Sequence, residues 1–435
     1  MTEPTLAVII LNWNGRDYLE DCLAALMAQT RPAESITLVD NGSSDDSVAF
    51  VRARFPGVAI RENGGNVGFA AGNNAALRRL TADVAVLLNP DVILSPDCLA
   101  ALVATLAADP TIGLAGGKLW YPDGASIQHA GGFITRPQAL PGHYGIGERD
   151  AGQFDTARDV EYLIGAAVAV RREVFEQIGF LDEGFFLFFE DVDLCARARR
   201  AGFRVVYTPA ATGIHVESAT AVRGSFAYLQ RFHTGRWRYL LKHFPIAMIL
   251  AETLPVEAAW LAGLEASERR AAGLAYLATR RRLVEIGAAR TREGAGDWSP
   301  ETERAIAAGL SDLWGRAKDT GRDPGALARL SAAAVLEERP FASATPLIGP
   351  LIARFRSAWN DVASRWYLRH LMEQQNAFNR LAVDLLTKYE AEAREMQELV
   401  ELLEEQVVIS SEMSVRLQEL EALVKEMERE ATARA

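Results

Sequence analysis

The chain has 435 residues, of which 49% are hydrophobic and 24% charged, and its formal net charge is −11. These values predict a globular protein of two or three domains, and the acidic balance argues against a general nucleic-acid binder, because phosphate backbones attract cationic surfaces. The cysteines Cys22, Cys98 and Cys195 are far apart and form no Cys-X-X-Cys pair. This argues against a disulfide framework or a zinc–thiolate site and favours a reducing cytosol.

The hydrophobic segments predict no signal peptide and no transmembrane helix. The N-terminal apolar run spans only Leu6–Leu11 and lacks a basic segment before it, so it indicates a first strand. The most apolar later segment, 246–264, contains Glu252, Pro255 and Glu257, whereas a membrane span needs about 18 or more apolar residues.

Residues 5–120 alternate short apolar runs with helix-period segments, a pattern that predicts a parallel sheet covered by helices. The predicted strands are 6–11, 36–39, 58–60, 84–88 and 112–115, with amphipathic helices such as 18–28 and 96–108 between them. In such sheets ligands bind beyond the carboxyl ends of the strands. The polar residues that follow the strands are therefore expected to share one crevice.

The pattern changes twice farther along the chain. Residues 121–160 are rich in Gly and Pro and predict loops over the crevice; they precede strands at 162–170, 204–207 and 213–216 and helices at 172–178 and 191–201. Strand signals end near residue 222. We therefore predict an α/β domain at 1–222, a helical and membrane-proximal domain at 223–339, a linker with amphipathic helices at 340–390, and a coiled-coil helix at 391–435.

Two acidic segments are candidate functional sites. In Leu-Leu-Asn-Pro-Asp, Asp91 follows a buried strand, where its carboxylate could bind Mg²⁺ or Mn²⁺ or could form an Asx-type turn. Glu190, Asp191 and Asp193 lie at the start of a predicted helix. The alternative to a catalytic role for these carboxylates is capping of the helix, stabilised by its dipole.

A histidine and a glycine-rich turn complete the candidates. His215 lies near the end of the last predicted strand, where its imidazole could complete an oxygen-rich metal site or could be a half-buried structural residue. The turn at 63–74 contains Asn66, Gly68 and Asn73 and opens a helix. Such a turn allows close approach of backbone N–H groups to phosphate, or is a plain loop-to-helix connection.

Seven segments, in this order, resemble glycosyltransferase family 2, whose members have the GT-A fold, and they are most similar to its rhamnosyltransferase-like branch. They are VIILNWNG (8–15), LVDNGSSDDS (38–47), ENGGNVGFAAGNN (62–74), LLNPDV (87–92), IQHAGG (127–132), the segment 165–205 and IHVES (214–218). The resemblance covers about half of the chain. It implies a Rossmann-like mixed sheet flanked by helices, followed here by an all-α region and a C-terminal coiled coil.

The resemblance also implies a role for individual residues. Asp91 and His215 would hold Mg²⁺ or Mn²⁺ at the donor diphosphate, and Asp191 would be the general base, with Glu190 and Arg197 in support. Arg197 would orient this loop or contact phosphate, or lie on a solvated helix face. The expected donor-binding residues are Asn12, Asp40, Asn66, Gly68, Asn73 and Asn89; Asn89 stands where many relatives have the first Asp of Asp-X-Asp, which leaves one negative charge fewer for the metal.

The resemblance implies an inverting, metal-dependent transfer of a sugar, with L-rhamnose from dTDP-rhamnose favoured, to a saccharide or lipid-linked acceptor in cell-surface polysaccharide synthesis. We expect a cytoplasmic protein, with peripheral contact at the inner face of the membrane. One alternative is a catalytically inactive GT-A-fold scaffold that oligomerises through its coiled coil. Another is a sugar nucleotidyltransferase, which the absence of a Gly-rich basic turn after the first strand disfavours.

Two features beyond residue 222 concern partners. Residues 227–244 mix aromatics with Arg231, Arg236, Arg238 and Lys242, which fits a membrane interface or a packed helix with a basic outer face. Between Met396 and Met427, apolar residues follow heptad spacing, which predicts a coiled coil and a homo-oligomer; the alternative is a long solvated helix folded back on its own chain.

Overall fold

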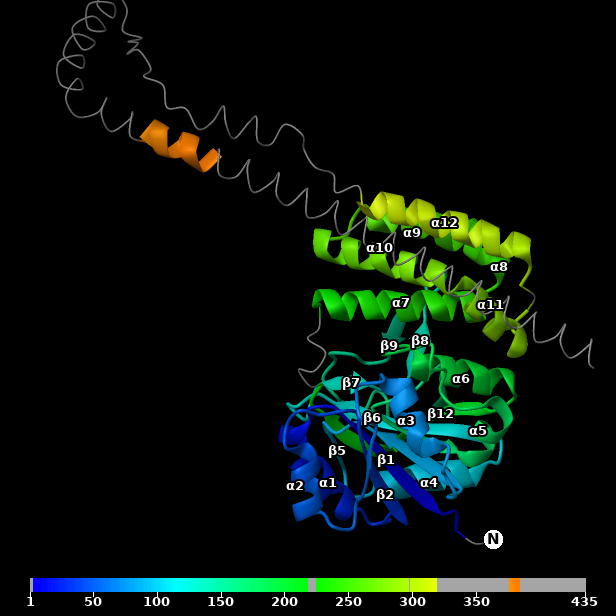
Figure 1. Cartoon of the computed structure of the whole chain (residues 1–435). Coiled ribbons are helices and arrows are strands. Elements are labelled where there is room, and N and C mark those ends of the chain that lie inside the picture. Colours follow the sequence, from blue (N-terminus) through cyan, green and yellow to red (C-terminus); the bar gives the residue numbers. More distant parts are fainter. Residues whose placement is uncertain (1–2, 218–223, 297, 319–374, 384–435) are drawn as a thin grey trace, which may run out of the picture. The chain divides into compact units, whose positions relative to one another are not determined.

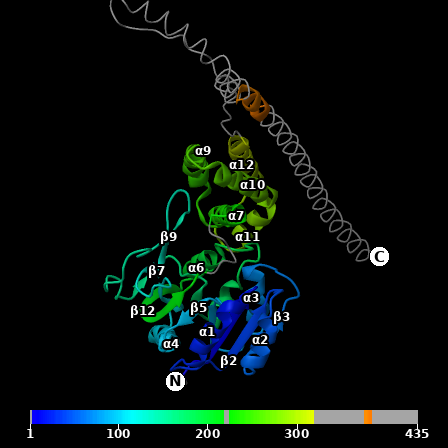
Figure 2. The same ribbon diagram turned by 90° about the vertical axis from the view of Figure 1, so that its left-hand side faces the viewer.

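A computed structural model of the chain describes residues 3–217, 224–296, 298–318 and 375–383. Its contacts divide the chain into two units, Met1–Lys318 and Asp319–Ala435. The first unit contains an α/β part and a set of helices stacked beside it (Figures 1 and 2). In the second unit residues 375–383 are helical; the predicted coiled coil at 391–435 lies outside the described residues.

The central sheet of the first unit has ten strands in the order β10-β12-β6-β11-β4-β1-β2-β3, with β5 beside β12 and β7 beside β6. These strands are β1 (Leu6–Asn12), β2 (Ser35–Asp40), β3 (Ala59–Glu62), β4 (Val84–Leu88), β5 (Val92–Leu94), β6 (Ile112–Trp120), β7 (Ile127–His129), β10 (Arg158–Asp159), β11 (Ala167–Arg171) and β12 (Arg204–His215). A separate antiparallel pair consists of β8 (Gly132–Ile134) and β9 (Pro141–His143).

The sheet is mixed, as the resemblance to the GT-A fold implies. The strands β1, β2, β3 and β4 pair in parallel, whereas β11 is antiparallel to both of its neighbours, β4 and β6. The two strands predicted at 204–207 and 213–216 are instead one strand, β12, whose register on β6 shifts between Tyr207 and Thr212. The strand thus runs without a break through residues 208–212, where the sequence pattern predicts an interruption.

Helices cover both faces of the sheet and bury its two sets of apolar side chains. They are α1 (Arg16–Met27), α2 (Ser47–Arg54), α3 (Phe69–Leu77), α4 (Cys98–Ala108), α5 (Arg172–Ile178) and α6 (Glu190–Arg200). Successive residues of β1 alternate between two apolar clusters: Val8 and Ile10 join one, and Ile9 and Leu11 join the other. Because side chains of a strand alternate between faces, β1 is buried on both sides.

The second half of the first unit is helical from residue 226 onward. Its helices are α7 (Phe226–His243), α8 (Ile246–Met248), η2 (Ile249–Thr253, a π-helical turn), α9 (Leu254–Leu261), α10 (Ala266–Arg281), α11 (Leu283–Arg292) and α12 (Pro300–Lys318). Of these, α7 and α11 lie next to the α/β part, with α10 and α12 beyond α7 (Figures 1 and 2). Among the described residues no helix combines the length and apolar composition that crossing a lipid bilayer requires.

Three of the four basic residues predicted at an interface on α7 do not form a basic surface; the fourth, Arg231, is exposed and lies over the ring of Phe186. Arg236, Arg238 and Lys242 are buried, so neither a membrane-facing side nor a basic outer face describes them. Arg236 pairs with the buried carboxylate of Glu257 on α9. Arg238 contacts Asp182 at 2.9 Å, so these cations join α7 to its neighbours on both sides.

Lys242 is the centre of a buried charge cluster between α6, α7 and the end of α11. Its ammonium lies 2.6 Å from Asp193, 2.7 Å from Asp182 and 2.9 Å from Glu293. Burial opposes the charged form, but the carboxylates of Asp193 and Asp182 outweigh it and raise the pKa of Lys242. Asp193 and Glu293, with His243, have the spacing of a metal-binding group, but here the ammonium of Lys242 already supplies their positive charge.

We expect Lys242→Met to destabilise the first unit by about 3–5 kcal/mol, because Asp193, Asp182 and Glu293 lose the buried cation that they share. Arg197 still pairs with Asp193 and Arg238 with Asp182. Chemical denaturation measures the free energy of unfolding. Arg304→Met is the control, since Arg304 pairs with Glu301 where both side chains are 75% exposed, and we expect no measurable change. Equal stability of Lys242→Met and the parent would show that the cluster contributes nothing.

Candidate active site

The ends of β1 and β2 place two predicted donor-binding residues side by side. Asn12 donates from Nδ2 to Asp40 Oδ1 at 3.3 Å and to Ser43 Oγ at 3.0 Å. The other oxygen of Asp40 accepts from the backbone N–H groups of Gly42 and Ser43. Asn12 and Asp40 are buried. The turn after β2 is therefore fixed by side chains at the carboxyl ends of both strands, where ligands of parallel sheets bind.

Side-chain hydrogen bonds of Asn66 hold the predicted glycine-rich turn in place. Asn66 Oδ1 accepts from Asn41 Nδ2 and from the N–H of Gly68, both at 3.0 Å. Gly68 has φ +87°, and a Cβ there would lie 2.6 Å from the carbonyl oxygen of Phe186, so only glycine fits. Asn66 and Gly68 line a cavity. Asn73 does not: it is buried within α3 and donates to the carbonyl of Phe69.

A cavity of about 270 Å³ brings together Asn89, Asp91 and His215. The antiparallel pairing of β5 with β12 sets Val92 opposite His215, which places the preceding Asp91 at the imidazole. His215 Nε2 lies 3.4 Å from Asp91 Oδ1. Two ligands of an octahedral Mg²⁺ ion are separated by about 3 Å, so this carboxylate–imidazole pair fits a divalent cation.

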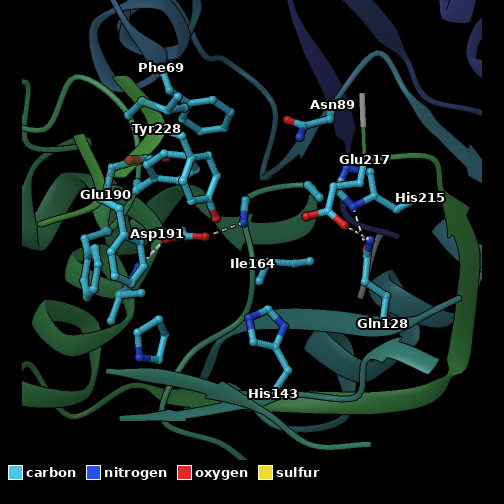
Figure 3. A pocket seen from close by; sticks show the side chains of 18 of the residues that line it. Phe69, Asn89, Gln128, His143, Ile164, Glu190, Asp191, His215, Glu217 and Tyr228 are labelled. Atoms are coloured by element: carbon cyan, nitrogen blue, oxygen red, sulfur yellow. Dashed lines mark hydrogen bonds between the residues drawn. The ribbon is translucent and has the colours of Figure 1, made fainter. Parts of the chain in front are cut away.

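A second cavity, of about 540 Å³, contains Asp191 and shares Asn89, His215 and an aromatic wall with the first. Figure 3 shows Asp191 and His215 on opposite sides of it. Asp191 Oδ2 accepts from the N–H of Gly165 at 2.8 Å. Burial raises the pKa of Asp191 above the ordinary aspartate value, although N–H groups of Gly165 and Val192 oppose the shift. A raised pKa makes this carboxylate a stronger base.

The backbone before α6 is strained. Phe188 and Phe189 have φ of 72° and 73°, a region that bulky residues rarely occupy and that costs of order 1–3 kcal/mol per residue. This turn places Phe188 and Phe189 in the wall of the larger cavity, next to Glu190 and Asp191. Such strain persists only where the surroundings enforce it, and it concentrates at functional sites.

The two residues predicted to support Asp191 differ in their surroundings. Glu190 is buried, and its Oε2 has no hydrogen-bond partner among the described residues. Burial, and then the charge of Asp191, raise the pKa of Glu190 well above its usual value. Arg197 is also buried, so a solvated helix face is wrong for this residue; it pairs with Asp193 at 2.7 Å and donates to the carbonyl of Phe180. Arg197 thus fixes the segment that leads to α6.

Sequence reasoning missed part of this site. Gln128 and Glu217 lie in matched motifs, but neither was assigned a role; both line the larger cavity. Tyr228 and Phe232 also line it and come from α7, which the sequence assigned to a separate helical domain. The aromatic content of 227–244 is the available signal, but it fits a membrane interface or a packed helix with a basic outer face and does not indicate a cavity wall.

The family model described as "Glycosyltransferase like family 2" matches residues 4–239. The chain belongs to this family and is a glycosyltransferase. Two strains of Mycobacterium tuberculosis have an N-acetylglucosaminyl-diphospho-decaprenol L-rhamnosyltransferase that is 28% identical over 256 residues, covering 54% of this chain and 83% of the relative. Rhamnosyltransferase WbbL of Escherichia coli K12 is 28% identical over 200 residues, covering 41% of this chain and 72% of the relative.

A solved structure with a similar fold is GalNAc-T7 with UDP, GalNAc and Mn²⁺. The TM-score is 0.50 at 15% sequence identity, and the match covers 72% of this chain and 58% of that one. At this identity the likeness concerns the fold. It agrees with a mixed α/β sheet of the GT-A kind.

We expect Glu190→Gln to raise the melting temperature at pH 7–8 by a few degrees, because the carboxyl is ionised in the unfolded parent whereas burial disfavours its ionised form in the folded one. For a carboxyl group whose pKa is raised on folding, the parent loses stability as the pH rises from the ordinary glutamate value toward the raised one. The gain should therefore disappear near pH 4. Differential scanning calorimetry measures it.

Glu176→Gln is the control for this measurement. Glu176 is 62% exposed at the end of an ion pair with Arg172, so no gain that increases with pH is expected. A Glu190→Gln protein whose melting temperature stayed equal to the parent's from pH 4 to pH 8 would contradict a raised pKa of Glu190 in the folded state.

Proposed function

We propose that the chain is an inverting, metal-dependent glycosyltransferase that moves L-rhamnose from dTDP-L-rhamnose to a saccharide or lipid-linked acceptor at the cytoplasmic face of the membrane. One observation carries the proposal: Asp191 and His215 line the same cavity, and His215 pairs with Asp91 in the adjoining one. A base and a cation-binding pair thus border the space that a donor sugar between them would occupy.

The donor would lie along the carboxyl ends of the strands. Asp40 and Asn12, which hydrogen-bond each other but do not line the smaller cavity, would bind the nucleobase end, and Asn66 and Gly68 would border that cavity. Asp91 and His215, with Asn89 beside them, would hold a Mg²⁺ or Mn²⁺ ion at the diphosphate. When bound, this ion supplies positive charge that stabilises the negative charge developing on the leaving diphosphate.

Asp191 would act on the acceptor. Its carboxylate takes the proton of the acceptor hydroxyl while that oxygen bonds to the anomeric carbon, and the bond from this carbon to the diphosphate oxygen breaks with its electrons. The diphosphate leaves as an anion and needs no proton, so one carboxylate suffices. Attack from the face opposite the leaving group inverts the anomeric centre. The N–H of Gly165 orients the carboxylate for this step.

The larger cavity suits an acceptor saccharide. Its walls carry aromatic rings from three parts of the chain, among them Phe69, Phe188 and Tyr228, and aromatic faces pack well against the C–H faces of sugars. The rhamnose donor and lipid-linked acceptor are inferred from the relatives, one of which is an N-acetylglucosaminyl-diphospho-decaprenol L-rhamnosyltransferase. Oligomerisation through 391–435 stays a prediction.

A thermal-shift screen of nucleotide sugars with Mn²⁺ tests the donor. Because a ligand that binds only the folded state raises the melting temperature, we expect dTDP-L-rhamnose to give the largest rise. A larger rise with another nucleotide sugar would replace rhamnose as the donor. No rise with any nucleotide sugar, and no donor hydrolysis or transfer with Mn²⁺, would favour the inactive scaffold.

We expect Asp191→Asn to lower the transfer rate by about 10²–10⁴-fold, the usual contribution of a general base, while the thermal shift caused by donor and Mn²⁺ stays near that of the parent. In the parent, the rate should fall as the pH drops through the raised pKa of Asp191, because only the ionised carboxylate accepts a proton. Asp21→Asn, at an exposed position of α1, is the control. Near-normal turnover of Asp191→Asn would remove Asp191 from the mechanism.

A further inference from the structure

Gln128 is the extra residue of a β-bulge at the edge of the site. On β6 the consecutive residues Leu119 and Trp120 pair with His129 and Ile127 of β7, so Gln128 has no partner on β6. A bulge turns the side chain of its extra residue away from the regular alternation, and bulges are common beside active sites. The side chain of Gln128 is buried and points to His215 (Figure 3).

The hydrogen bonds of Gln128 determine which nitrogen of His215 carries a proton. Gln128 Oε1 lies 2.6 Å from His215 Nδ1, and Gln128 Nε2 donates to Glu217 Oε2 at 3.4 Å. An ionised carboxylate only accepts hydrogen bonds, so the amide group of Gln128 faces Glu217 and its carbonyl oxygen faces His215. That oxygen can only accept, and Nδ1 of His215 must therefore donate.

A proton on Nδ1 leaves the lone pair of the neutral imidazole on Nε2. This is the nitrogen that lies 3.4 Å from Asp91 Oδ1, on the side where the cation would bind. A metal-binding histidine uses a deprotonated nitrogen, and its other nitrogen commonly donates to a neighbouring oxygen that fixes the ring and its tautomer.

We propose that Gln128 is a positioning residue for the cation site: together with Glu217 it holds His215 in the Nδ1–H tautomer, with Nε2 facing the cation. The inference rests on the proposed function for the assignment of Asp91 and His215 as metal ligands. Because of the bulge, Gln128 has no backbone partner on β6, and its side chain points to His215.

The test measures Mn²⁺ binding to the full chain in the presence of dTDP, by electron paramagnetic resonance of free Mn²⁺, so it needs neither donor sugar nor acceptor. Gln128→Met keeps the length of the side chain but removes the acceptor for Nδ1–H. We expect it to weaken Mn²⁺ binding about 10- to 100-fold, the usual effect of losing such a partner of a metal ligand.

A paired exchange separates positioning from simple packing. In Gln128→Glu combined with Glu217→Gln, the residue at 128 still accepts from His215 and now also accepts from the amide at 217. We expect Mn²⁺ affinity within about three-fold of the parent, whereas a merely structural role predicts a loss similar to that of Gln128→Met. Gln153→Met, at an exposed glutamine that contacts Glu148, is the control and should change nothing.

The outcomes are distinguishable. If the parent binds no Mn²⁺ with dTDP, the cation site of the proposed function fails and this inference fails with it. If the parent binds Mn²⁺ and Gln128→Met binds it equally well, the proposed function stands and the positioning role is wrong. Loss of binding in the paired exchange, with a melting temperature like the parent's, would also overturn it.

Discussion

The proposed cation site depends on the antiparallel pairing of two strands, β5 and β12. Asp91 and His215 lie more than a hundred positions apart, and the antiparallel ladder between β5 and β12 sets Val92 opposite His215. A slip of one residue would turn each side chain to the other face of its strand. The ladder is itself supported by β6, which pairs with β12 on its other edge. The distance between carboxylate and imidazole is therefore fixed by backbone hydrogen bonds.

The opposite side of the site depends on charge. Asp191 is on α6, and α6 is anchored through Asp193, which contacts Lys242 of α7 and Arg197 of its own helix. Buried charges of this kind are costly unless every partner is present. The strained turn at Phe188 and Phe189 directly precedes α6. The contacts of Asp193 with Lys242 and Arg197 hold the start of α6 in place, and the surroundings can therefore maintain this strained conformation.

Much of this could be predicted from the sequence, because strands and ligand-binding turns follow local patterns. The strands at 6–11 and 84–88 and the helix at 172–178 lie where expected. Of the polar residues after the strands, Asn89 and Asp91 line one cavity, whereas Asn12 and Asp40 do not line it. Two features could not be predicted because they depend on tertiary contacts. The cations of α7 look like surface residues until their buried partners at Asp182 and Glu257 are known. The bulge at Gln128 depends on register with β6, which the spacing within IQHAGG does not contain.

The match to the family model ends at residue 239, inside α7, whereas the first unit continues to Lys318. Lys242, which pairs with Asp193, and Glu257, which pairs with Arg236, lie beyond residue 239. Tyr228 and Phe232, which line the larger cavity, lie on α7 before residue 239. The family segment excised on its own would therefore retain its donor-side residues and this wall, but it would leave the buried Asp193 without Lys242 and the buried Arg236 without Glu257. Under the proposed function, a chimera that exchanges the α7 part of the cavity wall would therefore have to exchange the buried charge partners of α7, Asp182 and Glu257, with it.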